Sequence, residues 1–235
     1  MNRAITATDP IKESPLRDAG QSIREEMDDI LYDRVLPWVM LAVMGIIYAG
    51  FEWVRWLFDW RPSPLFASAA AVVVIALAVW QVVRARPAMD NLRLGLKGER
   101  ATAQFLDRSL IPLGYAVFHD ICCEGFNIDH ALVGPGGVFA VETKTRSKFG
   151  NARVTYDGTQ IRVDGIAPDR DPIVQAQANG RALQAILAQY AGQKVTVRSA
   201  VLFPGWFVEP QPKGVETWVL NEKVFVAYLR NEKRV

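Results

Sequence analysis

Two long uncharged apolar runs constrain this chain more than any other feature of its sequence. The first, residues 35–51, has seventeen residues, and the second, residues 65–83, has nineteen, with Gln81 its one strongly polar member. A bilayer core about 30 Å thick needs about 20 helical residues at about 1.5 Å each. The second run reaches this length directly, and the first does so when it extends to Leu57. The sequence therefore predicts two transmembrane helices, at about 35–57 and 65–83.

The surroundings of the two runs support this interpretation. Apolar residues at a helical spacing over 23–34 predict a short amphipathic helix that leads into the first span. Half of the chain is apolar and 22% is charged, which excludes both a disordered tail protein and a polytopic channel. Amphipathic rings collect at headgroup depth. Five of the seven tryptophans lie in this region, mostly near the ends of the runs: Trp38, Trp53, Trp56, Trp60 and Trp80.

Basic residues predict the orientation of the pair. Segment 1–34 carries five Lys or Arg, the short connection between the runs carries two, and Arg84 and Arg86 directly follow the second run. The positive-inside rule then puts both termini in the cytoplasm and only the short connection outside. The only cysteines, Cys122 and Cys123, are adjacent, which also favours a reducing compartment. We expect a multi-pass protein of the cell (inner) membrane.

Beyond Pro87 the pattern changes to that of a separate α/β domain. We expect a linker at 84–94 and a cytoplasmic domain at 95–235 that begins with a helix at 96–110. A Gly-Pro-Gly-Gly turn at 134–137 joins two of the strands that follow into a hairpin. The other expected elements are strands at 115–121, 127–133 and 138–144, a small hairpin of 154–156 with 161–163, a helix at 171–190, a strand at 194–203 and a closing helix at 222–230.

Three charged residues of the expected hairpin are candidates for a metal-binding and catalytic site. Asp129 lies in the second expected strand, and Glu142 and Lys144 lie in the third, on one face and about 6–7 Å apart. Two carboxylates and an ammonium group are costly to bury together unless a divalent metal accounts for them. Mg²⁺ prefers carboxylate and water oxygens and leaves room for substrate phosphate oxygens. The spacing alone also suits a solvated hairpin face.

Five segments occur over roughly residues 95–190 in the order known from one family. They are Gly98-Glu99, Asn127 to His130, Gly134 to Phe139, Val141 to Lys144, and Pro172 to Ala176 with Asn179. Through these segments the chain resembles the NERD (nuclease-related domain) family, a branch of the PD-(D/E)xK nuclease-like superfamily. The resemblance implies a restriction-endonuclease-like core: a mixed sheet flanked by helices, which here follows the two-helix transmembrane hairpin.

The resemblance also implies roles for individual residues. Asp129 and Glu142 would be the metal ligands, and Lys144 the catalytic base or charge stabiliser. Glu99 would be a supporting acid on the first helix, and Gln175 would have a polar role. Independently of the resemblance, Gln175 and Asn179 are one helical turn apart and could both contact DNA phosphate or the metal shell, although an ordinary helix surface explains both side chains as well.

Further basic residues follow the third strand. Arg146, Lys148 and Arg153 lie within ten residues of Lys144 and suit phosphate attraction, although such a run is often only a solvated loop. His130 directly follows Asp129 and therefore points to the opposite face of its strand, which indicates a structural role.

Two functions remain open from the sequence. The first is hydrolysis of nucleic acid phosphodiesters, preferably of DNA, with Mg²⁺ or Mn²⁺ at a membrane-anchored site; the acid-acid-lysine set favours it. The second is a catalytically inactive module that binds nucleic acid or a protein at the membrane. A net charge of only +3 over residues 95–235 and the lack of a separate DNA-reading motif favour the second.

Overall fold

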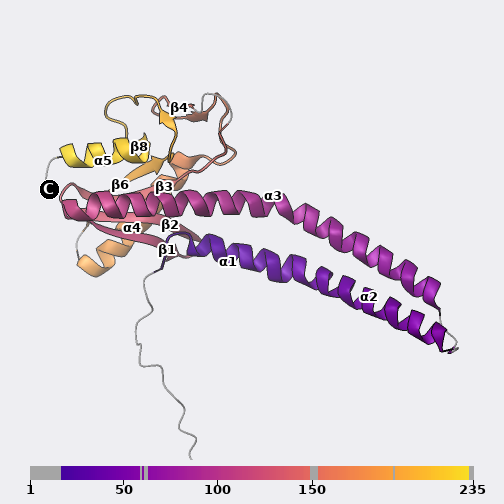
Figure 1. Cartoon of the computed structure of the whole chain (residues 1–235). Helices are drawn as coiled ribbons and strands as arrows, with labels where there is room; N and C mark the ends of the chain where they lie inside the picture. Colours follow the sequence, from indigo (N-terminus) through magenta and orange to yellow (C-terminus); the bar gives the residue numbers. More distant parts are fainter. Residues whose placement is uncertain (1–16, 59, 61–62, 149–152, 193, 233–235) are drawn as a thin grey trace, which may run out of the picture.

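The computed structural model describes residues 17–58, 60, 63–148, 153–192 and 194–232, and these form two distinct parts. A long arm of two helices projects from a compact α/β domain (Figure 1). The expected N-terminal segment is described only from Arg17 onward. Residues 59 and 61–62 of the expected external connection also lie outside the described residues.

The first side of the arm is one continuous helical stretch. It comprises α1 (Gln21–Asp29), the π-helical segment η1 (Ile30–Val35) and α2 (Leu36–Leu57). The expected amphipathic helix is therefore present, and it joins the first apolar helix without a break. Both long helices of the arm, Gln21–Leu57 and Pro64–Leu113, are long and apolar enough to cross a membrane.

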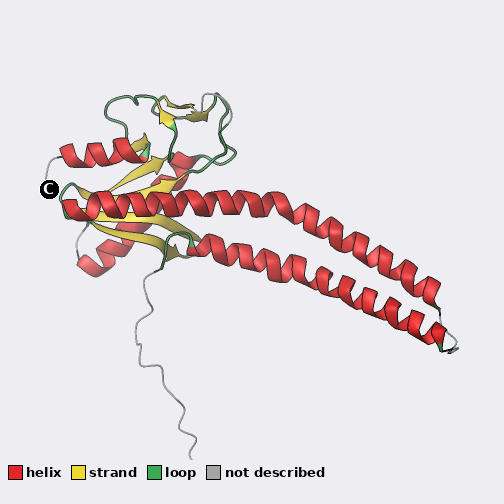
Figure 2. Ribbon diagram, viewed as in Figure 1, coloured by secondary structure: helices red, strands yellow, loops and turns green. Residues whose placement is uncertain are grey.

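The second side of the arm, α3 (Pro64–Leu110), runs antiparallel to the first. Figure 2 shows the two side by side from the start of α1 to the far end of the arm, while the domain end of α3 continues over the sheet. Gly20 donates its N–H to Glu99, and Gly45 lies against Ala71. Later residues of the first stretch therefore contact earlier residues of α3, as expected for an antiparallel pair of helices.

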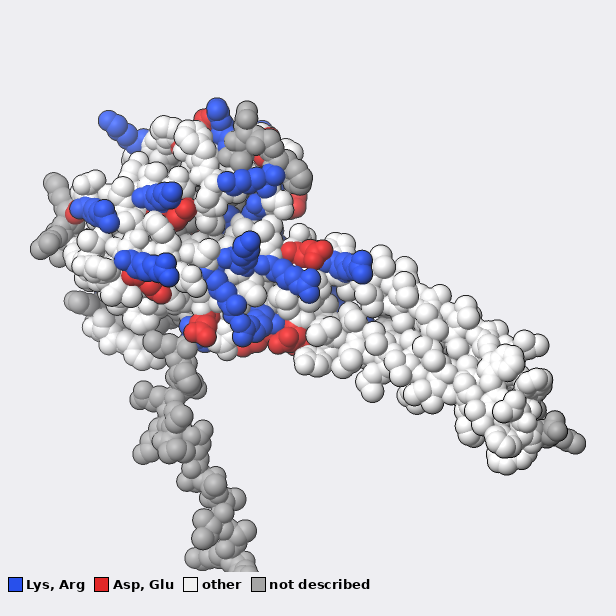
Figure 3. Space-filling model, in the orientation of Figure 1, with Lys and Arg blue, Asp and Glu red and all other residues white. Residues whose placement is uncertain are grey.

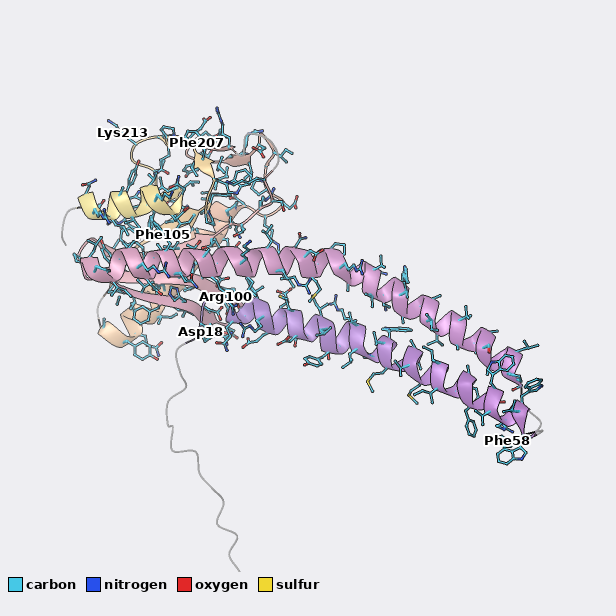
Figure 4. The ribbon with its side chains drawn as sticks, in the orientation of Figure 1. Asp18, Phe58, Arg100, Phe105, Phe207 and Lys213 are labelled. Atoms are coloured by element: carbon cyan, nitrogen blue, oxygen red, sulfur yellow. The ribbon has the colours of Figure 1, made fainter. Side chains whose placement is uncertain are left out.

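The expected linker at 84–94 is part of α3. The second apolar run and the first helix of the domain form a single helix of 47 residues, about 70 Å long, with Pro87 inside it. Good helix formers such as Arg, Ala, Met and Leu surround this proline. Contacts to α1 hold the segment after it, since the Ile23 side chain lies against Gly95. In Figure 4, Asp18 and Arg100 lie where the arm meets the domain and Phe58 lies at its far end.

A five-stranded mixed sheet forms the centre of the domain, in the order β1-β2-β3-β6-β8. The pairs β1–β2 and β2–β3 are antiparallel, while β3–β6 and β6–β8 are parallel. This confirms the expected mixed sheet and its hairpin. The strands are β1 (Ala116–Cys123), β2 (Phe126–Gly134), β3 (Gly137–Thr143), β6 (Val197–Leu202) and β8 (Thr217–Leu220).

Helices cover both faces of this sheet. Leu106 and Leu110 of α3 and Phe225 of α5 (Glu222–Asn231) share one apolar cluster with the strands. On the other face, Leu183 of α4 (Pro172–Ala191) packs against Ala140 of β3. The restriction-endonuclease-like architecture expected from the sequence is thus present, with helices on both sides.

A second, three-stranded sheet lies beside α4, in the order β5-β4-β7. Its strands are β4 (Arg153–Tyr156), β5 (Ile161–Val163) and β7 (Phe207–Val208). The small hairpin of β4 and β5 was expected, whereas β7 and β8 were not. Both unexpected strands are short, and both pair in parallel with strands distant in the sequence.

Candidate active site

The expected site residues come together at the end of the hairpin formed by β2 and β3. The last paired residues there are His130 and Val141, so Asp129 and Glu142 lie one position beyond the pairing. Lys144 was expected inside the third strand, but β3 ends at Thr143 and Lys144 is the next residue. It still lies beside Glu142, because its Nζ is 2.7 Å from Glu142 Oε1.

Two polar residues of α4 complete the surroundings of Glu142. Lys144 Nζ also donates to Gln175 Oε1 at 2.8 Å, and Asn179 Nδ2 donates to Glu142 Oε2 at 2.8 Å. Both oxygens of the nearly buried Glu142 are therefore engaged. One turn of α4 thus orients the lysine through Gln175 and the glutamate through Asn179.

Asp129 is fixed by the backbone of the neighbouring strand. The Thr143 N–H donates to Asp129 Oδ2 at 2.7 Å. Because Thr143 lies between Glu142 and Lys144, this bond couples the position of the aspartate to that of the other two residues. The three side chains of the acid-acid-lysine set are thus held by adjacent backbone positions and not by a flexible loop.

Glu99 joins the site because α3 passes very close to the segment after β3. A Cβ atom placed on Gly98 would lie 1.8 Å from Thr145 Oγ1, so only glycine permits this approach. Glu99 is buried, and its Oε1 accepts the N–H of Gly20 at 2.8 Å. Gly20 has a φ of 72°, which glycine adopts without strain. The N-terminal segment therefore covers Glu99, which the sequence did not suggest.

A second contact fixes the same N-terminal segment. The carboxylate of Asp120 on β1 is buried and accepts from Arg17 Nε at 2.6 Å. It also accepts from the Ser22 N–H at 3.1 Å and from Ser22 Oγ at 2.6 Å. Residues 17–22 and the helix that follows thus belong structurally to the domain that begins about 70 residues later.

The carboxylates of the site repel one another. Burial raises the pKa of Glu99 to about 7, and the charges of Asp120 and Glu142 contribute. Burial, then Glu142 and Glu99, raise the pKa of Asp129 well above its ordinary value. Burial also raises the pKa of Glu142, against the opposing effect of Lys144. One ammonium group therefore does not compensate the negative charge gathered here.

This donor set suits a hard divalent cation. Among the described residues, no three His, Cys, Asp or Glu side chains stand together as a ready-made cage. Mg²⁺ needs no such cage, because it commonly uses one or two carboxylates and fills its other positions with water and substrate phosphate. Asp129 and Glu142 offer carboxylate oxygens, and the excess of negative charge is the kind that a divalent cation neutralises.

Two cavities open along the segment that follows β3, residues 144–147. The smaller, of about 250 Å³, is lined by Lys144, Arg146 and Arg170 among others. The larger, of about 740 Å³, lies between α3 and the small sheet, and Arg146 lines it too. Arg170 did not stand out in the sequence, although its place directly before Asp171, the N-cap of α4, is a usable signal.

The other expected basic residues are engaged with partners of their own. Lys148 Nζ donates to the carbonyl oxygen of Gly205. Arg153 on β4 forms an ion pair with Glu209 at 2.8 Å and lies over the ring of Phe207. The structure thus brings Arg146 to the cavity beside Lys144, while Arg153 is engaged on the small sheet.

His130 has the expected structural surroundings. It is buried on the strand position after Asp129, and its Nδ1 lies 2.9 Å from His119 Nδ1. His119 Nε2 lies 3.1 Å from Asp107, and His130 Nε2 lies 3.1 Å from Thr143 Oγ1. Burial, then the charge of His119, lowers the pKa of His130 to about 3, so this ring is neutral at ordinary pH.

The fold and the site together define a nuclease-like domain: a mixed sheet with two acids and a lysine at the end of its central hairpin. The family model described as "Nuclease-related domain" (NERD) matches residues 94–204, which makes this part of the chain a nuclease-related domain, consistent with the PD-(D/E)xK nuclease-like superfamily. The match contains every expected site residue. No curated protein matches the chain.

Proposed function

We propose that this protein is a membrane-anchored nuclease that hydrolyses nucleic acid phosphodiesters, preferably of DNA, with Mg²⁺ or Mn²⁺. The observation that carries the proposal is the gathering of the Asp129, Glu142 and Glu99 carboxylates around the single ammonium group of Lys144. Nuclease-related domains suggest nucleic acid as the partner. The cavity lined by Lys144, Arg146 and Arg170 supplies positive charge for the phosphates of that partner.

In this mechanism Asp129 and Glu142 would hold the cation. When bound, it makes water a better nucleophile and shields the charge that develops on the phosphate. Lys144 orients the attacking water or stabilises that charge, and Gln175 fixes the ammonium group for this task through its 2.8 Å contact. Glu99, with its raised pKa, holds a proton near neutral pH and tunes the charge of the cluster. Arg146 attracts the phosphate chain.

The alternative is a catalytically inactive module that binds nucleic acid or a protein at the membrane. It is favoured by the fact that Lys144 and Asn179 already occupy both oxygens of Glu142. In the nuclease, Glu142 would exchange part of this bonding for a contact with the cation. In the binding module, the lysine remains a permanent partner of the glutamate and contributes to affinity only.

The decisive experiment compares variants of the purified full chain in detergent. Labelled single-stranded DNA, double-stranded DNA and RNA are incubated with Mg²⁺, with Mn²⁺ and with EDTA. Lys144→Ala is expected to reduce hydrolysis by about 10²- to 10⁴-fold while cation binding, measured by calorimetry, is kept or tightened. Lys213→Ala, an exposed lysine at the outer edge of the domain (Figure 4), is the matched control and is expected to cut like the parent.

The cation itself is tested by thermal unfolding. A ligand that binds only the folded state stabilises it by about 2.7 kcal/mol at a concentration 100 times its Kd. Mg²⁺ or Mn²⁺ is therefore expected to raise the Tm of the parent and not that of Asp129→Asn. Equal cation binding by parent and variant, together with no cleavage of any of the three substrates, would leave the binding module as the function.

We further propose that the arm spans the cell (inner) membrane with the domain on the cytoplasmic side. Cys122 is exposed on β1 and is a natural probe of this orientation. A membrane-impermeant maleimide is expected to label it only after cells are permeabilised. Ser63→Cys in a chain that lacks both native cysteines, placed at the start of α3, is expected to be labelled in intact cells. The opposite labelling pattern would reverse the topology.

A further inference from the structure

The arm contains a small basic cavity at the level where both apolar runs end on the side of the domain. Arg34 is the residue directly before the first run, and Arg84 directly follows the second. Because the two helices are antiparallel, both guanidinium groups lie at the same end of the arm. A cavity of about 130 Å³ lies between them, lined by Ile30, Arg34, Gln81, Arg84, Ala85 and Ala88.

The local backbone of the first helix is unusual at this cavity. Ile30 and Arg34, one turn apart, both belong to the π-helical segment η1. π-Helical turns are rare and are frequently found at functional sites. Here the wider turn coincides with the basic cavity and with the start of the apolar stretch. Above and below it the two helices pack closely, as the contacts of Gly95 with Ile23 and of Gly45 with Ala71 show.

The polar side chains of the cavity have no hydrogen-bond or ion-pair partners among the described residues. Neither Arg34 nor Arg84 forms an ion pair there, and no carboxylate belongs to the described lining. Arg84 lies over the ring of Trp80, with its Cζ 5.3 Å from the ring centroid. Gln81 is the one strongly polar residue of its apolar run and takes part in none of the side-chain hydrogen bonds of the described chain.

The charge distribution of the surface agrees with this placement. In Figure 3, Lys and Arg gather where the arm meets the domain, while the visible face of the outer arm carries almost no charge. A polar side chain inside an apolar span is costly and usually has a functional partner. Two arginines and an amide, all hydrogen-bond donors, at the depth of the lipid headgroups call for an anion with several acceptor oxygens.

We propose that this cavity binds the phosphate of an anionic phospholipid from the leaflet on the side of the domain. The proposal rests on the membrane anchoring proposed above. Arg34 and Arg84 hold the phosphate oxygens from two sides, and Gln81, about one turn deeper along α3, donates to the headgroup from below. Basic pockets between transmembrane helices are known to suit lipid headgroups. The volume equals about four water molecules at about 30 Å³ each, which is enough for a phosphate group and not for a whole lipid.

The test uses the full chain in a zwitterionic detergent, titrated with dioctanoyl phosphatidylglycerol by calorimetry. Dioctanoyl phosphatidylcholine and inorganic phosphate are titrated in parallel. The parent is expected to bind phosphatidylglycerol at least about tenfold more tightly than either. The double variant Arg34→Gln/Arg84→Gln is expected to lose this preference, and Gln81→Leu, which suits an apolar span, to weaken it by a smaller factor.

A double variant with the same change in net charge is the matched control. Arg24→Gln/Arg93→Gln removes one arginine from each of the same two helices, ten and nine residues farther from the membrane boundary. It is expected to bind phosphatidylglycerol like the parent. Equal losses in both double variants would overturn the cavity in favour of general charge attraction. Inorganic phosphate that binds as tightly as the lipid would overturn the assignment to a lipid.

A flotation experiment distinguishes failure of the membrane anchoring from failure of the lipid site alone. The parent is mixed with phosphatidylcholine vesicles and floated on a density gradient without any anionic lipid. A chain that does not float refutes the membrane anchoring and the lipid site with it. A chain that floats but shows no preference for phosphatidylglycerol refutes the lipid site alone.

Discussion

The two ends of α3 show how the same residue types serve two different surroundings. In the arm, Leu65 and Phe66 are 79% and 75% exposed, whereas Leu106 and Leu110 in the domain are fully buried. A helix with exposed apolar residues along most of its length needs a surrounding other than water, while the buried end is stabilised by the packing of the domain. The two ends of this one unbroken helix are therefore stabilised in different ways, and the stability of each end can be tested separately.

The largest expected effect distinguishes the two ends by the same substitution. Leu106→Ala is expected to destabilise the domain by about 2–5 kcal/mol, because it leaves a cavity under the sheet. Leu77→Ala on the same helix removes a side chain that is 42% exposed in the arm and is expected to leave domain stability unchanged. Hydrogen exchange of the β3 amides in the full chain measures both. Similar loss of β3 protection in both variants would break the distinction between the two ends.

The folding stability of the domain, unlike that of the arm, is expected to depend on pH through Glu99. The pKa of Glu99 is about 7 in the folded state against 4.5 as its ordinary value. Between these values the folded chain holds a proton that the unfolded chain has lost, so this group makes stability fall as pH rises through about 7. Glu99→Gln removes the effect and is expected to gain about 1–3 kcal/mol over the parent between pH 5 and pH 8.

Thermal unfolding at a series of pH values in EDTA measures this difference. Gln keeps the oxygen that accepts the Gly20 N–H, so the contact with the N-terminal segment is preserved. A constant difference between parent and variant across this pH range would show that Glu99 is ionised throughout. Added Mg²⁺ is expected to reduce the gain of the variant, because a cation favours the ionised carboxylates.

The smallest expected effect concerns the contact that joins the two parts. Ser22→Ala removes the hydroxyl that donates to the buried Asp120 at 2.6 Å and is expected to cost about 1 kcal/mol. Faster hydrogen exchange is expected in α1, with β3 unaffected. Ser109→Ala on α3, whose side chain makes no hydrogen bond among the described residues, is the control. Faster exchange throughout the domain would indicate that the N-terminal segment supports the whole fold.

Hydropathy and local turn signals are sufficient to predict much of this architecture. The two apolar helices follow from their length, and the hairpin of β2 and β3 follows from the Gly-Pro-Gly-Gly turn. The acid-acid-lysine set could also be located, because strand alternation places Glu142 and Lys144 on one side. These features depend on residues that are close in the sequence, and they were therefore predictable.

Features that depend on distant residues were not predictable in this way. Pro87 and the change in composition suggested a linker, but 84–94 is part of the continuous α3 and lies against η1 of the first helical stretch. β8 has only four residues, and its pairing with β6 decides its structure. The contacts of residues 17–22 with Glu99 and Asp120 span about 80 to 100 positions, so nothing local signals them. A fragment that starts near residue 88 lacks these contacts.

Because α3 is continuous, the number of residues between the apolar run and the candidate site fixes two quantities together. These are the distance of the site along the helix axis and its direction around that axis. Fifteen residues separate Arg84 from Glu99, so the site lies about 22 Å along the helix axis from the end of the apolar run. One residue inserted between them would lift the site by only about 1.5 Å but would swing it by about 100° around the axis. A change in the number of residues in this segment therefore alters the orientation of the site far more than its distance from the apolar run. In the proposed membrane-anchored nuclease, this number decides which way the cavity beside Lys144 faces relative to the membrane surface, and hence from which side a nucleic acid can approach it.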